Sequence, residues 1–226
     1  MSNEVNTLTD LSGEITHCVR CSLSETRKQP VPGWFPDDAE KILFIADAPT
    51  SVEDASGLPL IGHHGTKFSQ MVYEEMDLLR EEYNVTYCVK CLPVYNGKVD
   101  RPRREALFWC AEHLYKQIEL IQPKLIVSLG YTPFFVLLRR NSIDFAGIAK
   151  ISMEDYLGKI YLNKTLPPVS ELEVPTIVTY DPAAWAISKK HRKAAREHFE
   201  FIGQVWNDIK AGESIEHLLR SRDEIQ

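Results

Sequence analysis

Short apolar runs, separated by longer polar stretches, are the main feature of the hydrophobic pattern along this chain. Four of these runs read as strands buried on both faces: residues 41–46, 85–89, 125–130 and 175–180. Runs of about four to eight apolar residues bounded by Pro, Gly or polar residues are typical of the strands of a parallel sheet.

Between these strands, apolar side chains recur at helical spacing. This pattern predicts helices over residues 67–83, 105–121, 131–140 and 188–210. Strands that alternate with helices favour an α/β fold, with three α/β/α layers and a central, mostly parallel sheet. We expect a single domain over residues 1–226, with a flexible N-terminus at 1–16. The weakly patterned segment 141–174 reads either as an inserted hairpin or as a flexible excursion.

The order of the strands also predicts where functional side chains lie. In open α/β sheets, ligands bind beyond the carboxyl ends of the strands. Three loops follow predicted strands in this way, at residues 47–65, 90–104 and 181–190. We therefore expect these loops to build a functional cleft.

Composition narrows the class of protein. The 226 residues are 44% hydrophobic and 26% charged, and no apolar run approaches the roughly 20 residues that span a bilayer. The polar, acidic start of the chain lacks the apolar core of a secretory signal, so we expect a cytoplasmic protein without membrane association. In that compartment, the five cysteines read as metal ligands or core thiols rather than as disulfides.

The charge balance limits how the chain could bind nucleic acid. A net charge of −6 argues against a protein that coats nucleic acid without specificity. Two local basic groups remain, one formed by Arg101, Arg103 and Arg104 and a denser one over residues 189–193. Each reads either as a solvated face or as a set of phosphate contacts.

Four of the five cysteines are candidate metal ligands. Cys18 and Cys21 form a CxxC knuckle, whereas Cys91 and Cys110 lie far along the chain and must be brought to it by the fold. Four thiolates suit either a structural zinc ion or an iron–sulfur cluster. The alternative is a set of unrelated buried thiols, because free Cys is among the most buried residue types.

Several motifs in the same order resemble the family-4 uracil-DNA glycosylases, the iron–sulfur branch of that superfamily. The segment CVRCSLSETR is similar to the family's opening CxxC motif, and residues 46–65 are similar to its first active loop. The family's TNVVKCRPP corresponds to residues 86–93, and its helix–Pro–Lys–strand pattern corresponds to residues 105–130. The resemblance covers residues 17–140 and resumes at 175–205.

This resemblance implies a DNA glycosylase that acts on a flipped nucleotide, and we expect it to work as a monomer. It also implies a [4Fe-4S] cluster held by Cys18, Cys21, Cys91 and Cys110, with zinc as a minor alternative. Cys88 is then left over as a core thiol.

Three departures from the family pattern fall at the implied base pocket. Leu60 replaces a Phe that stacks on uracil, Tyr87 replaces an Asn that hydrogen-bonds the uracil edge, and Asp181 replaces the His of an HPxxLLR loop. Ala48 and His64 complete the candidate pocket, and His64 reads either as a polar loop residue or as a replacement for the missing donor. We therefore expect a modified or damaged base, rather than plain uracil, as the substrate.

Carboxylates are the candidate catalytic groups. Loss of a base develops positive charge on the sugar, which a carboxylate stabilises, and a carboxylate can also deprotonate the attacking water. Asp47 and Glu53 lie on the first functional loop, and Asp181 lies where the family His donates to the departing base. The alternative for Asp47 and Glu53 is a role as turn and capping residues.

The segment after Asp181 corresponds to the family loop that wedges the DNA duplex open. Trp185 and Ile187 are candidates for the wedge, and the alternative for Trp185 is packing between helices. The basic residues that follow are candidates for phosphate contacts: Lys189, Lys190, Arg192 and Lys193.

Two functions fit these observations. One is a DNA glycosylase with altered base specificity, such as a host enzyme for antiviral defence or a phage enzyme that handles its own DNA. The other is a catalytically inactive DNA-binding module that keeps the fold and the cluster. Retention of Asp47 and Glu53 favours the enzyme, and loss of the family Asn and His favours the binding module.

Overall fold

A sheet of six strands forms the centre of the part of the protein that the structure describes. The computed structural model describes residues 6–138, 153–163 and 174–220. The strands of the sheet are β1 (Ile42–Ala46), β2 (Asn84–Tyr87), β5 (Leu125–Leu129), β6 (Ile160–Asn163), β7 (Val174–Thr179) and β8 (Leu219–Arg220). Their order across the sheet is β2-β1-β5-β7-β6-β8.

Most of this sheet is parallel, as the sequence predicted. β1 pairs in parallel with β2 on one side and with β5 on the other, and β5 pairs in parallel with β7. β6 runs antiparallel to β7, and β8 pairs with β6. Because β5 lies between β1 and β7, the residues that follow these three strands meet at one edge of the sheet.

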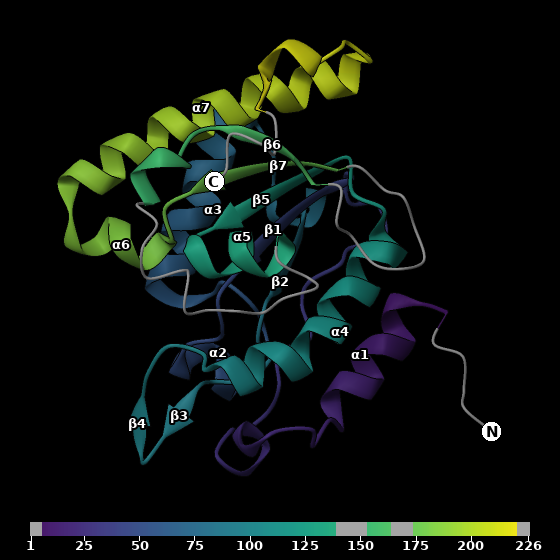
Figure 1. The fold of residues 1–226 in the computed structure, drawn as a ribbon, viewed down its shortest axis with the longest axis vertical. Helices are drawn as coiled ribbons and strands as arrows, with labels where there is room; N and C mark the ends of the chain where they lie inside the picture. Colours follow the sequence, from purple (N-terminus) through teal and green to yellow (C-terminus); the bar gives the residue numbers. More distant parts are fainter. Residues whose placement is uncertain (1–5, 139–152, 164–173, 221–226) are drawn as a thin grey trace.

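Helices cover both faces of the sheet and give the three layers seen in Figure 1. Successive strand residues point to opposite faces, so each face of the sheet is apolar. Phe44 packs in a core cluster with α3 (Gly62–Met76) and α7 (Lys189–Ala211). Its neighbour Leu43 packs in a second cluster with α4 (Arg104–Ile121). The prediction of an α/β/α fold is therefore confirmed.

The largest difference from the predicted helices concerns α3. The apolar pattern indicated a helix over residues 67–83, but α3 starts at Gly62 and ends at Met76. Asp77 caps it in the left-handed conformation with φ 53°, and Leu79 is exposed in the loop beyond. Leu79 had matched the helical spacing only by chance. By contrast, α4 and α7 begin and end within one residue of their predicted bounds.

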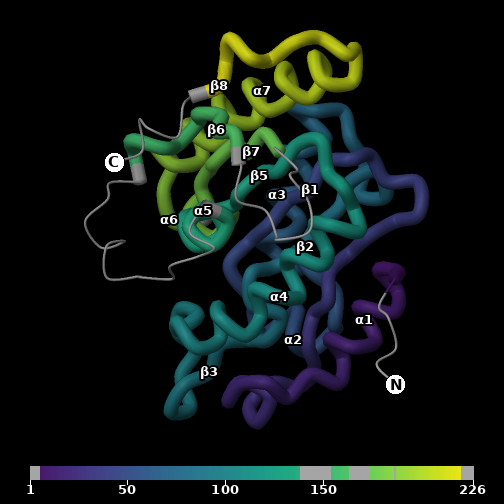
Figure 2. The backbone as a smooth tube through the Cα atoms, turned by 45° about the vertical axis from the view of Figure 1, so that its right-hand side comes forward, coloured from purple at the N-terminus to yellow at the C-terminus, as the bar shows by residue number. Residues whose placement is uncertain are grey.

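The expectation of a flexible segment at residues 1–16 is wrong from Leu8 onward. Residues Leu8–Thr16 form helix α1, and the Thr7 side chain caps it by accepting a hydrogen bond from the Asp10 amide. Leu11 and Ile15 are fully buried, because α1 lies beside α4 in both views (Figures 1 and 2). Amphipathic spacing within this short stretch was the signal that predicts the helix.

Part of segment 141–174 belongs to the central sheet. Met153–Asp155 form a 3-10 turn, and β6 pairs antiparallel with β7. This pairing favours the hairpin alternative over a flexible excursion. Residues 139–152 and 164–173, including the end of the predicted helix 131–140, lie outside the described residues.

Short elements make up the remainder of the described chain. The helices are α2 (Ser51–Ser56), α5 (Tyr131–Leu138) and α6 (Pro182–Ile187), and β3 (Val94–Tyr95) forms a hairpin with β4 (Lys98–Val99). Three further 3-10 turns cover Ser22–Glu25, Arg80–Glu82 and Glu216–Leu218. None of the described helices combines the length and the apolar character needed to cross a membrane.

The close crossing of α3 and α7 gives a first prediction. A Cβ atom at Gly203 of α7 would lie 2.4 Å from the Glu75 carbonyl oxygen of α3, so Gly203→Ala must push the helices apart. We expect a loss of about 1–3 kcal/mol of unfolding free energy, as for other overpacked cores. The measurement is thermal unfolding followed by circular dichroism.

Gly13 in α1 provides the matched control. It has nothing within 4 Å of its Cβ position, so Gly13→Ala should raise stability by up to about 1 kcal/mol through helix propensity. Equal melting temperatures for Gly203→Ala and the native chain would contradict the tight crossing.

Candidate active site

The carboxyl ends of three adjacent strands bring two aspartates and a glycine together. Asp47 follows β1, Gly130 follows β5 and Asp181 is two residues beyond β7. Since β5 is the middle strand of the three, Gly130 lies between the two carboxyl groups. A Cβ atom at Gly130 would lie 3.4 Å from Asp181 Cβ and 3.5 Å from Asp47 Oδ1. The topology of the sheet thus assembles two of the three predicted catalytic residues.

The carboxyl group of Asp47 is buried, and one of its two oxygens has no hydrogen-bond partner among the described residues. Its Oδ2 accepts a hydrogen bond of 2.9 Å from Thr132 Oγ1 in the first turn of α5. Its Oδ1 is buried and has no hydrogen-bond partner among the described residues. Burial and then the nearby charge of Asp181 raise the pKa of Asp47 to about 7. Such a group exchanges a proton readily near neutral pH.

Asp181 caps α6 and also lies beside Gly130 in the candidate site. Its Oδ1 accepts a hydrogen bond of 2.7 Å from the Ala183 amide and caps α6. Withdrawal from water raises the pKa of Asp181, whereas the Ala183 amide and the charge of His64 oppose this rise. His64, in the first turn of α3, therefore faces Asp181, and its Nδ1 is buried without a partner in the described part of the chain.

Glu53 has a structural role in the loop above the site. It is 2% exposed, and its carboxylate accepts hydrogen bonds from the Thr50 amide at 2.7 Å and the Ile61 amide at 3.2 Å. The first of these completes a capping box at the start of α2. Glu53 thereby ties the two ends of the loop 50–61 together, as the capping alternative predicted.

The candidate base pocket is held together by hydrogen bonds among its own residues. The Tyr87 side chain is buried, and its hydroxyl accepts a hydrogen bond of 2.9 Å from the Leu60 amide. Burial, followed by the charge of Glu53 and a hydrogen bond with it, holds the pKa of Tyr87 well above its usual value. Leu60 is buried in the left-handed conformation with φ 46°, and Ala48 is half-buried beside the cleft.

The four predicted cysteine ligands meet on the side of the sheet that carries α4. Cys91 and Cys110 are buried, while Cys18 and Cys21 are partly exposed in the turn after α1. Burial raises the pKa of Cys91 and raises that of Cys110 to about 12, and the charges of Cys18 and Cys21 act on Cys91. Cys91 therefore lies within electrostatic reach of Cys18 and Cys21, and Cys110 within reach of Cys91 and Cys21.

N–H donors surround these thiols, as a cluster of thiolates requires. Arg27 Nη1 donates to Cys91 Sγ at 3.2 Å, and the Lys90 amide donates to Cys110. His113 Nε2 lies 3.5 Å from Cys18 Sγ. Within the described ranges, no group of three or more Cys, His, Asp or Glu side chains is spaced to hold a single metal ion. The donor set fits a group that carries negative charge, such as a thiolate-bound cluster.

A buried lysine that the sequence did not single out links the cysteines to the pocket. Lys90 Nζ donates to Thr86 Oγ1 and Gln117 Oε1 at 2.8 Å and to the Tyr87 carbonyl. Burial lowers the pKa of Lys90 to about 8. Since Cys91 is the next residue, this network connects the end of β2 to the cysteine group. Cys88 is buried here, as predicted for a core thiol.

The structure does not support Trp185 as a DNA wedge. Trp185 is 1% exposed, and its ring packs edge-on against Phe199 of α7 with centroids 5.6 Å apart. The helix-packing alternative is therefore correct, because α6 turns its apolar face toward α7. Ile187, the other wedge candidate, lies at the end of α6 and is 85% exposed.

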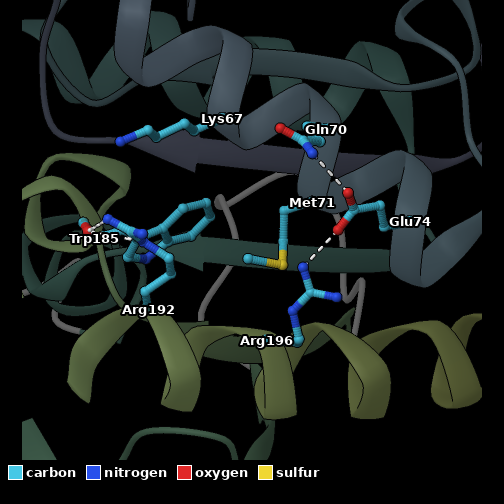
Figure 3. Close-up of a pocket in the computed structure, with 7 residues that line it drawn as sticks. All are labelled: Lys67, Gln70, Met71, Glu74, Trp185, Arg192 and Arg196. Carbon is cyan, nitrogen blue, oxygen red and sulfur yellow. Dashed lines mark hydrogen bonds and ion pairs between the residues drawn. The ribbon is translucent and has the colours of Figure 1, made fainter. Parts of the chain in front are cut away.

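The predicted phosphate contacts differ in how freely their side chains are placed. Lys189 and Lys190 are exposed in the first turn of α7, whereas Arg192 donates to the Trp185 carbonyl at 3.0 Å and joins α7 to α6. Figure 3 shows Arg192 at the wall of a pocket between α3 and the α6–α7 pair. Arg196 and Glu74 form an ion pair at its other end.

Two residues of the site had not been singled out from the sequence. Thr132 orients Asp47, and the charge of Arg101 lowers the pKa of both Asp47 and Asp181. Thr132 lies in the first turn of α5, directly after β5, and Arg101 lies in the predicted functional loop 90–104, so the buried strand before Gly130 was the signal that could have found Thr132. Arg101 was assigned only to a basic patch.

Comparisons with known proteins agree with this geometry. Residues 32–210 match the family described as the uracil DNA glycosylase superfamily. The chain is 30% identical over 201 residues to a type-4 uracil-DNA glycosylase of Sulfurisphaera tokodaii, which spans 89% of this chain and 86% of the relative. A protein of the same name from Saccharolobus solfataricus is 31% identical over 195 residues, or 86% of this chain and 84% of the relative.

A third relative extends the match over nearly its whole length. The type-4 uracil-DNA glycosylase of Archaeoglobus fulgidus is 30% identical over 206 residues, which cover 89% of this chain and 94% of the relative. The matched region contains Asp47, Gly130 and Asp181, the residues that form the sheet-edge site. This chain therefore belongs to the uracil-DNA glycosylase superfamily, and within it to the type-4 family.

Proposed function

We propose that this protein is a DNA glycosylase, a hydrolase that cleaves the N-glycosidic bond of a modified or damaged base in DNA. The observation that carries the proposal is the Asp47 carboxyl at the end of β1, with Oδ1 buried and unpartnered within the described chain. Membership of the type-4 family supports the reaction class, because the relatives are named uracil-DNA glycosylases.

The same observation disfavours the alternative of an inactive DNA-binding module. Two carboxyl groups that share one site away from water repel each other and lose hydration. A catalytically inactive protein has no use for two carboxyl groups that destabilise its fold in this way. Active sites, in contrast, commonly contain groups with shifted pKa values. Asp47 and Asp181 are placed in this way on opposite sides of Gly130.

Asp47 is the residue that we propose to act on water. As the base leaves, positive charge develops on the sugar, and a nearby carboxylate stabilises it and accepts the proton of the attacking water. Glu53 does not take this role in our proposal, because backbone amides at Thr50 and Ile61 hold its carboxylate. It is a positioning residue for the loop.

The pocket supports a base other than uracil. An amide at position 87 could offer one donor and one acceptor to the uracil edge, but the Tyr87 hydroxyl is engaged by the Leu60 amide. Leu60 adds an aliphatic wall without an aromatic stacking face. We propose that the pocket selects its base mainly by shape, and that this base is a modified or damaged pyrimidine.

We further propose that Cys18, Cys21, Cys91 and Cys110 hold a [4Fe-4S] cluster. Thiols that converge from α4, the end of β2 and the turn after α1 support this assignment, as do the N–H donors from Arg27 and Lys90. The cluster would supply cross-links between these three segments. Metal–thiolate bonds of this kind contribute directly to folding free energy.

The DNA contacts are the last part of the proposal. Ile187 is exposed six residues after Asp181, so we assign the wedge to it. Lys189 and Lys190 follow it on the surface, and we assign to them the contacts with phosphates on either side of a flipped nucleotide.

A panel of modified oligonucleotides tests the proposed function. Each duplex carries one 5-hydroxymethylcytosine, 5-hydroxymethyluracil, 5-formylcytosine, thymine glycol or uracil, and abasic sites are revealed by alkali cleavage. We expect release of one or more modified bases and little or no release of uracil, because the pocket offers uracil no free amide. Rapid uracil release would contradict the pocket assignment. DNA binding without release of any base would favour the inactive module.

Replacement of Asp47 tests its catalytic role. Asp47→Asn should lower the single-turnover rate on the released base by about 10²–10⁴-fold, the range typical of a lost general base. DNA affinity should stay nearly unchanged, because the carboxylate acts mainly in the transition state. The exposed Asp38 gives the control variant Asp38→Asn, which should keep full activity. Full activity of Asp47→Asn would rule out this role.

The cluster assignment has a matched control among the cysteines themselves. A Ser at position 18, 21, 91 or 110 should abolish the visible absorbance, lower the iron and sulfide content and lower the melting temperature, because each thiolate is a ligand. Cys88→Ser should keep the cluster, since Cys88 is a buried thiol near Asp47 and is not one of the four proposed ligands. Zinc without iron in anaerobically purified protein would show that the assignment is wrong.

A further inference from the structure

The two carboxyl groups beside Gly130 each have one oxygen engaged and one that points toward the same place. Asp47 Oδ2 is bonded to Thr132 Oγ1, and Asp181 Oδ1 is bonded to the Ala183 amide. The other two oxygens, Asp47 Oδ1 and Asp181 Oδ2, lie 3.5 and 3.9 Å from the position that a Cβ of Gly130 would occupy. Both of these oxygens therefore lie within 4 Å of one point beside Gly130.

Gly130 keeps this point free of protein atoms. Its φ of +103° lies in the region that side chains rarely adopt, and its amide is fixed by a 2.9 Å hydrogen bond to the Thr179 carbonyl. A side chain here would fill the space between the two carboxyl groups. The absence of a Cβ thus leaves room for a proton, a water molecule or a substrate atom between them.

Electrostatics favours one proton on this pair. Two ionised carboxylates that face each other away from water repel strongly, and a single shared proton removes most of that repulsion. One member then remains a carboxylate, and the other is a carboxylic acid. The hydrolysis of an N-glycosidic bond needs both forms, because water must lose a proton and the departing base must gain one.

We propose that Asp47 and Asp181 form an acid–base pair that carries one proton across Gly130 and performs both proton transfers of base release. This inference rests on the proposed glycosylase function. It assigns the role of proton donor to Asp181, at the position where the family pattern has His.

The proton count of the proposed step is balanced. Water oxygen bonds to the sugar C1′ as the bond from C1′ to the base nitrogen breaks, and the bonding electron pair leaves with the base. The Asp181 carboxyl gives its proton to an acceptor atom of the base, while the Asp47 carboxylate takes a proton from the water. The products are the free base and an abasic sugar, and the pair still carries one proton.

Other charged or titratable groups surround the pair and bias where its proton sits. Arg101 acts on both members, and its positive charge lowers the pKa of each. His64 also lowers the pKa of Asp181, whereas Glu53 raises it. Within the described ranges, Cys88 also interacts with Asp47, and Tyr87 also interacts with Asp181.

Because the reaction needs one proton on the pair, its rate should fall both above and below an optimum pH. Above about pH 7, the upper transition of the pair, the shared proton is lost and no donor remains for the base. At acid pH the pair binds a second proton and no carboxylate remains for the water. The proposal therefore predicts a bell-shaped profile, with macroscopic pKa values that belong to the pair. A lone water-activating carboxylate would instead give a rate that stays constant above pH 7.

A carboxyl titration of the DNA-free protein tests the pair without any substrate. Aspartate is labelled with ¹³C at Cγ, and the Asp47 and Asp181 signals are assigned by their loss in Asp47→Asn and Asp181→Asn. We expect one transition near pH 7 in the native protein, and we expect it to move to lower pH in Asp181→Asn because a repelling charge is removed. Independent transitions of both residues below about pH 5 would overturn the proposal.

Single-turnover rates across pH provide the second test, on the panel oligonucleotide that is cleaved fastest. Asp181→Asn should lose about 10²–10⁴-fold in rate and lose the alkaline fall, because no proton donor is left. Asp181→His should recover part of the rate with a new alkaline limb, and Asp38→Asn, at an exposed position, should keep the native profile. A constant rate above pH 7 in the native protein, or loss of the alkaline limb in His64→Gln alone, would overturn the proposal.

These two tests distinguish a failure of the acid–base pair from a failure of the proposed glycosylase function. If no oligonucleotide of the panel is cleaved, the glycosylase assignment fails, while the titration still shows whether the two aspartates share a proton. If bases are released but the titration shows no transition near pH 7, the glycosylase assignment stands and the acid–base pair is wrong.

Discussion

The candidate active site depends on a glycine at the end of the middle strand of a parallel sheet. β5 lies between β1 and β7, so the residue that follows it separates the side chains that follow its neighbours. Because that residue is Gly130, Asp47 and Asp181 can approach one point from both sides. The parallel arrangement brings these residues to one edge of the sheet. Because Gly130 has no Cβ, a small space remains between the two carboxyl groups.

The loop above this space is held by polar groups that the protein satisfies internally. Glu53 accepts hydrogen bonds from the amides of Thr50 and Ile61, and Tyr87 accepts one from the Leu60 amide, so these bonds fix both ends of the loop. Leu60 and Tyr87 are joined by a hydrogen bond, and the charge of Asp181 acts on Tyr87, so these three residues are coupled in the structure.

The cysteine group and the pocket share one buried network. Lys90 donates to the Tyr87 carbonyl and to Gln117 of α4, and it directly precedes Cys91. Buried hydrogen bonds therefore join the segment before Cys91 to the end of β2, and they satisfy an ammonium group that would be costly to bury without partners.

The sequence by itself determined the layers, the parallel strands and the loops that carry Asp47 and Asp181, because apolar periodicity and strand order are local properties of the chain. It did not reveal α1 or the early end of α3, where capping by Thr7 and Asp77 sets the boundaries. Tertiary structure alone decided that Trp185 is buried, that Glu53 is held by backbone amides and that Thr132 and Arg101 face Asp47. Such roles depend on which side chains meet across elements, and distances between elements are fixed only when the whole core packs.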